Sequence, residues 1–363
     1  MIKIHLIAAA RPNFMKIAPL YHALSAEPWC QVSLVHTGQH YDANMSEAFF
    51  RDLKLPTPHF HLEVGSGTHA EQTGRVMMAY EKVALADRPD WIVVVGDVNS
   101  TAACAMVGAK LWIPVVHLEA GLRSRDRRMP EEINRLVTDA IADVLWTPSA
   151  DADENLRAEG VPPERIECIG NIMIDSYEMV REAIDRDTTR TTLGMTDRRY
   201  GVVTLHRPSN VDSQTTLSHL ATSLSKAAER LPLVFAVHPR TRTRLRDFGL
   251  ESMLEAGNVT LIEPLGYVQF MGLVSGAAVV ITDSGGVQEE TTYLGIACLT
   301  LRENTERPIT VTVGSNRLIT IDNLNEELDR ALAVKGRLGK RPELWDGNAS
   351  RRAVASLKRR AGI

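Results

Sequence analysis

The sequence predicts a doubly wound α/β architecture with two domains. Short apolar runs recur along the chain, amphipathic stretches lie between most of them, and 363 residues are too many for one typical core. Runs that are apolar at successive positions are typical of parallel strands buried on both faces of a sheet. Strands that alternate with helices in this way favour parallel sheets covered by helices on both sides.

The expected strands fall on either side of a predicted domain boundary near Gly170-Asn171. A polar run at 185–199 follows that boundary, and a new strand–helix series begins at Gly201. The predicted strands are 4–8, 32–36, 91–95, 115–118, 202–205, 233–237, 259–262 and 279–281. We therefore expect one domain over 1–170 and a second over 171–347, each of a comfortable size, and a last helix over 348–361 that packs back on the first domain.

Composition excludes several classes of partner. Hydrophobic residues make up 44% of the chain, charged residues 24%, and the net charge is −4, so nothing favours a nucleic-acid or membrane partner. No apolar run approaches the roughly 18 residues of a membrane helix, and the apolar N-terminus is interpreted as a first buried strand rather than a signal peptide. The four cysteines are widely separated and form no C-x-x-C pair, which fits free thiols in the cytoplasm.

The segment 283–290, Asp-Ser-Gly-Gly-Val-Gln-Glu-Glu, carries the most information. It follows an apolar run and opens a stretch with helical spacing. Unpaired N–H groups at a helix start, beside glycines, form a site for a phosphate. Glu289 and Glu290, one turn further on, suit sugar hydroxyls better than phosphates. The segment therefore predicts a site for a nucleotide with a diphosphate and a ribose, and the alternative is an ordinary strand-to-helix turn.

Other predicted strands also end in ionisable groups, where ligands of such sheets bind. In the first domain these are Arg11 and Lys16 after the first strand, Asp97 after 91–95 and Glu119 after 115–118; in the second they are His206 and His238. An NAD site would place G-x-G-x-x-G after the first strand, but Ala-Ala-Ala-Arg-Pro stands at 8–12, and no P-loop is present. A dehydrogenase is therefore disfavoured.

Three further features allow structural interpretations. Glu131 and Arg135 follow Pro130 on one helix face, four residues apart, and from spacing alone they predict a surface ion pair. Asp97 could simply cap the helix that follows it. His59 and His61 form an H-x-H pair without further ligands, so we interpret them as solvated loop histidines and expect no metal.

Together these residues resemble the non-hydrolysing UDP-N-acetylglucosamine 2-epimerases. The similarity extends from the first strand to beyond Arg307, and the combination is far more specific than any one piece. The segments that carry it are Arg11-Pro12 with Lys16, Gly96-Asp97, 117–123, 130–135, 204–207, 282–290 and 305–308.

The resemblance implies a GT-B fold, in which two Rossmann-like domains close on a nucleotide sugar in the cleft between them. It also implies interconversion of UDP-GlcNAc and UDP-ManNAc without metal or nicotinamide, so we expect no cofactor. The C2 proton is removed, UDP leaves C1, and UDP returns to a 2-acetamidoglucal after a proton reaches the opposite face. Members of the family are usually homodimers.

The resemblance also implies roles for individual residues. Asp97, Glu119 and Glu131 fill the acid–base positions, and which of them serves which face of C2 stays open. His206 lies near the leaving diphosphate. The remaining positions are Arg11, Lys16 and Arg135 as cationic or orienting groups, Ser284, Gly285 and Gly286 for the diphosphate, and Glu290 for the ribose hydroxyls, with Arg307 nearby. Since the C2 proton is poorly acidic, the base and the stabilisation of departing UDP must act together.

The chain departs from the pattern of many bacterial members at 206–210, at 238–241 and after Gln39-His40. These regions contribute to an activating second UDP-GlcNAc site in the family, so we expect that activation to be absent or altered. Ile309 stands where a Glu is usual, so the identity of the sugar in the substrate stays open. Arg125, Arg127 and Arg128 could face the uronate of UDP-2,3-diacetamido-2,3-dideoxyglucuronate, or they could form a solvated run. The sequence is also compatible with a GT-B glycosyltransferase, a hydrolysing 2-epimerase or a silent nucleotide-sugar sensor.

Overall fold

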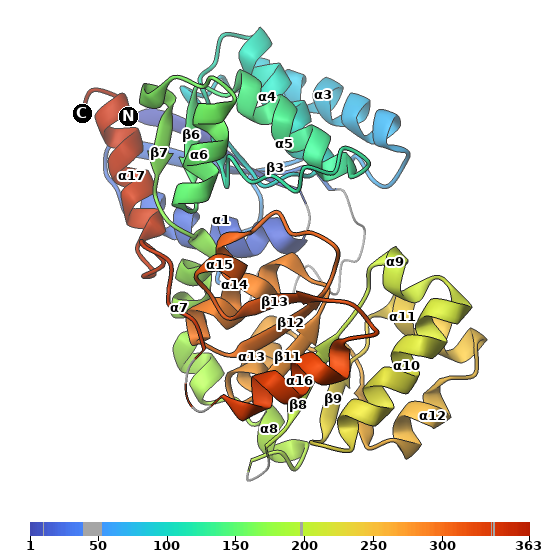
Figure 1. The fold of residues 1–363 in the computed structure, drawn as a ribbon. Helices are drawn as coiled ribbons and strands as arrows, with labels where there is room; N and C mark the ends of the chain where they lie inside the picture. Colours follow the sequence, from blue (N-terminus) through green and yellow to red (C-terminus); the bar gives the residue numbers. More distant parts are fainter. Residues whose placement is uncertain (10, 39–52, 197–198, 335, 337) are drawn as a thin grey trace. The chain divides into compact units, whose positions relative to one another are not determined.

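The computed structural model describes residues 1–9, 11–38, 53–196, 199–334, 336 and 338–363. The chain forms two compact units, Met1–Val180 with Glu343–Ile363, and Arg181–Pro342 (Figure 1). The change of unit falls within one helix, α7 (Ile172–Asp185), ten residues after the boundary near Gly170 that the sequence suggested.

The first unit is built on a parallel sheet, which among the described residues has seven strands in the order β3-β2-β1-β4-β5-β6-β7. Its strands are β1 (Ile2–Ala8), β2 (Cys30–His36), β3 (Phe60–His61), β4 (Trp91–Val95), β5 (Val115–Leu118), β6 (Val144–Thr147) and β7 (Ile166–Cys168). The central strands are buried along almost their whole length, because helices cover both faces. From β1 the chain order runs through β2 to β3 at one edge, and from β4 it runs through β5 and β6 to β7 at the other edge. This is the arrangement of a doubly wound sheet.

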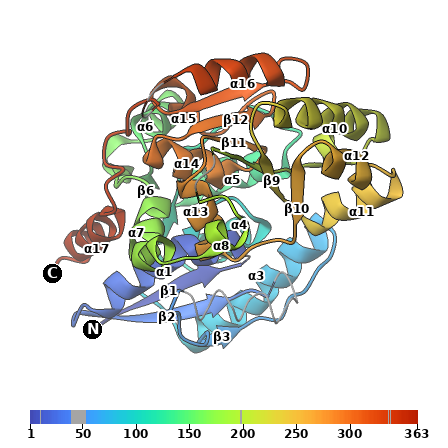
Figure 2. The same ribbon diagram turned by 90° about the horizontal axis from the view of Figure 1, so that it is seen from below.

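Helices α3, α4 and α5 cover one face of this sheet, and α1 packs with α17 on the other (Figures 1 and 2). The helices of this unit include α1 (Arg11–Ser25), α3 (His69–Ala86), α4 (Asn99–Lys110), α5 (Pro130–Ile141), α6 (Ala150–Ala158), the short 3-10 helix η1 (Pro163–Arg165) and α17 (Ala349–Arg360). The start of α17 is held by Asp175, whose carboxylate accepts from the Ala349 N–H at 3.0 Å and the Ser350 N–H at 2.7 Å. The C-terminal helix is therefore part of the first unit.

The second unit has a parallel sheet of six strands among the described residues, in the order β10-β9-β8-β11-β12-β13. The strands are β8 (Gly201–Thr204), β9 (Leu233–Ala236), β10 (Val259–Ile262), β11 (Val279–Thr282), β12 (Ala297–Leu301) and β13 (Asn316–Ile319). The helices are α8 (Thr189–Thr192), α9 (Pro208–Val211), α10 (Gln214–Ala228), α11 (Pro239–Asp247), α12 (Glu251–Ala256), α13 (Tyr267–Ser275), α14 (Gly285–Leu294), α15 (Ile309–Thr312) and α16 (Leu324–Ala333). One face of the sheet packs with α10, α12 and α16 around a continuous apolar core.

Every strand that the sequence predicted is present, and the doubly wound architecture is confirmed in both units. The sequence analysis missed β3, β6, β7, β12 and β13. Three of these, β3, β7 and β13, are edge strands, whose mixed polarity hides them from a search for apolar runs. In the part of the chain that the structure describes, no helix combines the length and the apolar character needed to cross a bilayer.

Candidate functional site

In the first unit, two neighbouring strands end in the predicted acidic residues. β4 and β5 pair in register up to Val95 and Leu118, so Asp97 and Glu119 both follow the carboxyl edge of the sheet. Glu119 adopts a φ of +75°, a left-handed backbone that a residue other than glycine rarely takes. Such strain concentrates at functional sites, where the surrounding structure holds it in place.

Glu119 forms a buried ion pair with Lys16 of α1. Only 7% of the Glu119 side chain and 10% of the Lys16 side chain are exposed, so each charge depends on the other. Gly96, with a φ of +69°, lies directly beside the pair: a Cβ there would be 3.4 Å from both Glu119 Oε2 and Lys16 Nζ. The fold thus brings Lys16 and Glu119 together as predicted site residues, and a glycine leaves room beside them.

Asp97 is paired with Arg135 of α5, which is 1% exposed. The same guanidinium donates to Glu132 through Nε at 3.0 Å and Nη2 at 2.6 Å. The amide of Asn134 donates to the Asp97 carbonyl at 2.9 Å. Arg135 therefore ties Asp97 to α5 and does not act as an isolated cation.

The predicted surface ion pair of Glu131 with Arg135 is wrong, because Arg135 turns inward to Glu132 and Asp97 while Glu131 is exposed. Glu132 also accepts from the backbone N–H groups of Ser124 and Arg125, both at 2.9 Å. Burial raises the pKa of Glu132, but the hydrogen bonds from Arg135 and from this backbone outweigh it and lower the pKa. The role of Glu132 was missed, although its i,i+3 spacing to Arg135 could have revealed it.

In the second unit, Asp283 organises the end of two neighbouring strands. It follows β11, is fully buried, and accepts hydrogen bonds from the N–H groups of His206 at 3.1 Å and Arg207 at 2.9 Å and from the Asn210 amide at 2.9 Å. Its Oδ1 also lies 3.0 Å from His206 Nδ1. Burial raises the pKa of Asp283, yet the contact with His206 and the other hydrogen bonds hold it below its usual value. An ionised Asp283 engages Nδ1, so Nε2 is the His206 nitrogen available to a ligand.

The Ser284-Gly285-Gly286 turn starts α14, as predicted. Ser284 is the residue before the helix, and a Cβ on Gly285 would come within 2.8 Å of Arg307 NH1 and of Glu306 Oε1. Arg307 pairs with Glu306 at 2.5 Å and, through Nε, with Glu289 at 2.9 Å. The predicted residue Arg307 therefore lies against the helix N-terminus, with its charge matched by the carboxylates of Glu306 and Glu289.

Glu290 lies in the same helix and is 4% exposed. Burial raises its pKa to about 8; a contact with the Tyr267 hydroxyl lowers it, and the nearby charge of Glu289 raises it further. A carboxyl in this state is neutral over much of the physiological range and can both donate and accept hydrogen bonds.

Three other groups of residues from the sequence analysis do not join these clusters. Arg11 is the first residue of α1, but its side chain lies outside the described residues, as do Gln39-His40-Tyr41-Asp42. His61 belongs to β3 rather than to a loop, and its Nε2 lies 3.3 Å from His36 Nδ1. Among the described residues, no group of three or more His, Cys, Asp or Glu side chains is placed to hold a metal ion.

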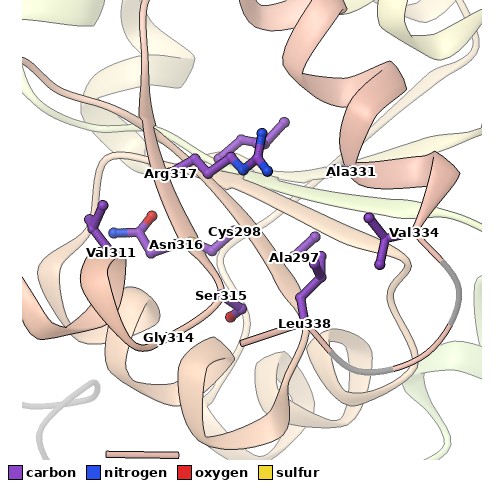
Figure 3. A pocket seen from close by; sticks show the side chains of 11 residues that line it. Ala297, Cys298, Val311, Gly314, Ser315, Asn316, Arg317, Ala331, Val334 and Leu338 are labelled. Carbon is purple, nitrogen blue, oxygen red and sulfur yellow. The ribbon is translucent and has the colours of Figure 1, made fainter. Parts of the chain in front are cut away.

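A pocket of about 340 Å³ lies elsewhere in the second unit, beside β12 and β13 (Figure 3). Its lining is mostly apolar and contains none of the predicted site residues; the labelled side chains include Cys298, Asn316 and Val334. The residues predicted from the strand ends, and not this pocket, therefore form the candidate site.

The chain is similar to proteins named as 2-epimerases along almost its whole length. A family model described as UDP-N-acetylglucosamine 2-epimerase matches residues 22–358. A UDP-N-acetylglucosamine 2-epimerase of Methanocaldococcus jannaschii is 41% identical over 98% of this chain and 99% of its own. A UDP-2,3-diacetamido-2,3-dideoxy-D-glucuronate 2-epimerase of Pseudomonas aeruginosa is 40% identical over 88% of each chain.

Among solved structures, the M. jannaschii UDP-GlcNAc 2-epimerase in complex with UDP-GlcNAc and UDP is similar, with a TM-score of 0.90 and 39% identity over 98% of this chain and 99% of that one. This likeness, with the two parallel Rossmann-like sheets, confirms the predicted GT-B fold class. The chain is an enzyme of the UDP-N-acetylglucosamine 2-epimerase family.

Proposed function

We propose that this enzyme interconverts UDP-GlcNAc and UDP-ManNAc by inverting C2 through elimination and re-addition of UDP. The observation that carries the proposal is the pairing of two acidic residues with buried cations at neighbouring strand ends, Glu119 with Lys16 and Asp97 with Arg135. A buried cation keeps a carboxylate ionised, which is the state that a base must have to take the C2 proton. The names of the relatives supply the substrate class.

In the proposed reaction, one carboxylate takes the C2 proton as the C1–O bond to UDP breaks, which gives 2-acetamidoglucal and UDP. A proton is then delivered to C2 from the other face as UDP re-adds to C1. Asp97, Glu119 and Glu131 are the proposed acid–base groups. Glu131 is exposed in the described structure, whereas Glu119 is buried and Asp97 partly buried, so Glu119 and Asp97 have the stronger support.

The second unit carries the groups proposed to hold UDP. His206 presents Nε2, Arg307 lies at the start of α14, and the backbone N–H groups after Ser284 are suited to a phosphate. Glu290 is proposed to bind the ribose hydroxyls. Stabilisation of charge that develops on departing UDP is the largest contribution expected from such groups.

The test is proton NMR of the purified enzyme with UDP-GlcNAc in D2O. UDP-ManNAc with deuterium at C2, without accumulation of free UDP, is the expected result. Free UDP with ManNAc would show hydrolysis, and transfer only in the presence of an acceptor would show a glycosyltransferase. Tight binding without turnover would show a sensor.

A second substrate calls for the same test, because the diacetamido-glucuronate relative is nearly as similar as the UDP-GlcNAc relative. Of the arginines that could face a uronate, Arg125 donates to Asn155 at 2.7 Å and Arg128 pairs with Asp126 at 2.9 Å. These exposed contacts do not separate the two sugars, and the greater coverage of the UDP-GlcNAc relative, 98% of this chain against 88%, favours UDP-GlcNAc. A higher kcat/KM for the diacetamido-uronate would reverse this choice.

Two further properties are proposed from the resemblance. The enzyme is proposed to be a cytoplasmic homodimer, and light scattering on the purified protein tests the dimer. Activation by a second UDP-GlcNAc molecule is proposed to be absent or altered; near one departing segment, Arg240 and Arg244 are engaged by Asp212. A lag or a sigmoidal rate curve that added UDP-GlcNAc abolishes would refute this.

A further inference from the structure

A buried charge network lies behind the strand ends of the first unit. His117, in β5, has no exposed surface; its Nδ1 lies 2.6 Å from Asp139 Oδ1 and its Nε2 lies 2.8 Å from the Gly96 carbonyl oxygen. Asp139, in α5, is 1% exposed. Both ring nitrogens of His117 are therefore engaged by protein atoms, and neither reaches a ligand.

The partners of the ring fix its protons. The Gly96 carbonyl can only accept, so Nε2 must carry a hydrogen. The other oxygen of Asp139 accepts from Arg123 Nη1 at 2.7 Å and from the Gly121 N–H at 3.1 Å. Two donors, one of them a cation, favour the ionised form of Asp139, and a carboxylate can only accept from Nδ1. A ring that donates from both nitrogens is an imidazolium.

The charges around this ring balance. Arg123 also forms two parallel hydrogen bonds to Glu159, at 2.8 Å and 2.7 Å. The imidazolium and one guanidinium are thus matched by two carboxylates, which is the condition for keeping charges buried. Arg165, which is half-buried, donates to the backbone carbonyl of Asp139 at 3.2 Å and lies at the edge of this balanced group. Burial raises the pKa of Asp139, but His117 and Arg123 outweigh it and hold the pKa below its usual value.

The network touches the backbone on both sides of the proposed acid–base residues. Gly96, whose carbonyl His117 holds, directly precedes Asp97. His117 precedes Glu119 by two residues, and Gly121, whose N–H Asp139 holds, follows it by two. The strained backbone of Glu119 is therefore fixed before and after it, since its φ of +75° needs support from its neighbours.

We propose that His117 is a positioning residue, whose ring donates from both nitrogens and locks the Gly96-Asp97 turn and the Glu119 turn in the geometry that proton transfer at C2 requires. The inference rests on the proposed function for its consequence in catalysis. The charge of the ring is a separate claim that stands on the hydrogen-bond pattern alone.

The charge is tested by nitrogen-15 NMR of the full-length enzyme with labelled histidine, with the His117 signals assigned by their loss in His117→Gln. Two similar, protonated ring nitrogens at pH 7.5 are expected. In Asp139→Asn, the amide can still accept from Arg123 and donate to Nδ1, so a neutral ring with two dissimilar nitrogens is expected. A neutral ring in the unmodified enzyme would overturn the proposed charge.

The positioning role is tested by steady-state kinetics of the same two variants with UDP-GlcNAc. We expect kcat to fall about 10-fold or more, with KM changed less than about 3-fold, because misplacing acid–base groups affects the chemical step and leaves nucleotide binding intact. His219→Gln, the same substitution at a half-exposed surface histidine, is the matched control and should keep full activity. Asp139→Asn with a neutral ring and unchanged kcat would overturn the role of the charge.

The design separates this inference from the proposed function. If the unmodified enzyme does not epimerise UDP-GlcNAc, the proposed function fails, while the NMR spectra still decide whether His117 is an imidazolium. If His117→Gln does not fold, the folded Asp139→Asn variant and the pH dependence of the unmodified ring signals carry the test. A rise in KM as large as the fall in kcat would indicate a structural role only and would contradict the proposal.

Discussion

Glu119 and Asp97 of the first unit and Glu290 of the second have different electrostatic surroundings. In the first unit, Glu119 and Asp97 each have a cationic partner, Lys16 and Arg135. In the second unit, Glu290 is buried beside another acid, and its pKa is raised to about 8. A carboxylate paired with a cation stays ionised and can act as a base, whereas an unmatched one is held neutral and suits hydrogen bonds with hydroxyl groups. The difference is consistent with the proposed roles, proton transfer in the first unit and ribose recognition in the second.

The largest effect is expected from Glu119→Gln, which keeps the shape of the side chain and removes its charge. Loss of a general acid–base group lowers kcat by about 10²- to 10⁴-fold. KM for UDP-GlcNAc should change little, because the proposed nucleotide groups lie in the second unit. Steady-state rates and deuterium exchange at C2 measure both quantities.

Glu182→Gln is the matched control for that substitution. Glu182 is 88% exposed and pairs across one helical turn with Arg186, so the variant should keep full activity. If Glu119→Gln retains more than about a tenth of the kcat, Glu119 is not an acid–base group of the reaction, and the proposed difference between the two units fails.

Glu290→Gln should change the pH dependence of stability. Because the pKa of Glu290 is higher in the folded protein than in the unfolded chain, the folded protein holds this proton more tightly. The free energy of unfolding is therefore highest below about pH 4.5 and falls as the pH rises towards 8. In Glu290→Gln this fall in the free energy of unfolding, which we expect to be on the order of 3 kcal/mol between pH 4.5 and 8, should be absent. Urea unfolding at pH 5 and pH 8 measures it.

One result would contradict the prediction for Glu290. Equal pH slopes of unfolding in the unmodified protein and in Glu290→Gln would show that the carboxyl is ionised and compensated in the folded state. In that case the two units would not differ in the way described, and Glu290 would need a cationic partner.

The third effect is expected from Asp283→Asn. Asp283 accepts from His206 Nδ1 and from two backbone N–H groups, and an amide can replace only part of this pattern. His206 loses the acceptor that fixes its orientation, so kcat should fall about 10- to 100-fold. A combined Asp283→Asn, His206→Gln variant no slower than His206→Gln alone would show that Asp283 acts through His206. Additive losses would show that it does not.

The architecture could be predicted from the sequence because parallel strands buried on both faces are apolar at successive positions. Edge strands such as β3, with a single apolar residue, escape that rule. The positions of candidate residues could also be predicted, since chain order places Asp97, Glu119 and Asp283 directly after buried strands. Their partners could not be predicted in this way: spacing gave Arg135 to Glu131, whereas in the folded chain Arg135 pairs with Glu132 and Asp97. A partner distant in sequence, such as Lys16 for Glu119, depends on tertiary structure that no local pattern encodes.

The smallest effect is expected from Gly285→Ala, and it compares the turns of the two units directly. Gly285 does not need a left-handed backbone, and alanine favours helices by about 0.5–1 kcal/mol over glycine, so the substitution would stabilise α14 if space allowed. Its Cβ would, however, come within 2.8 Å of Arg307 NH1 and Glu306 Oε1, and both side chains are tied by ion pairs. We expect a net loss of about 1 kcal/mol and a KM for UDP-GlcNAc raised about 3- to 10-fold, with kcat kept. Gly96→Ala is the counterpart in the first unit: it strains a φ of +69° beside Lys16 and Glu119, so there kcat should fall while KM is kept. If Gly285→Ala instead raised the melting temperature and left KM unchanged, Arg307 would be free to move aside, and its place at the diphosphate would have to be given up.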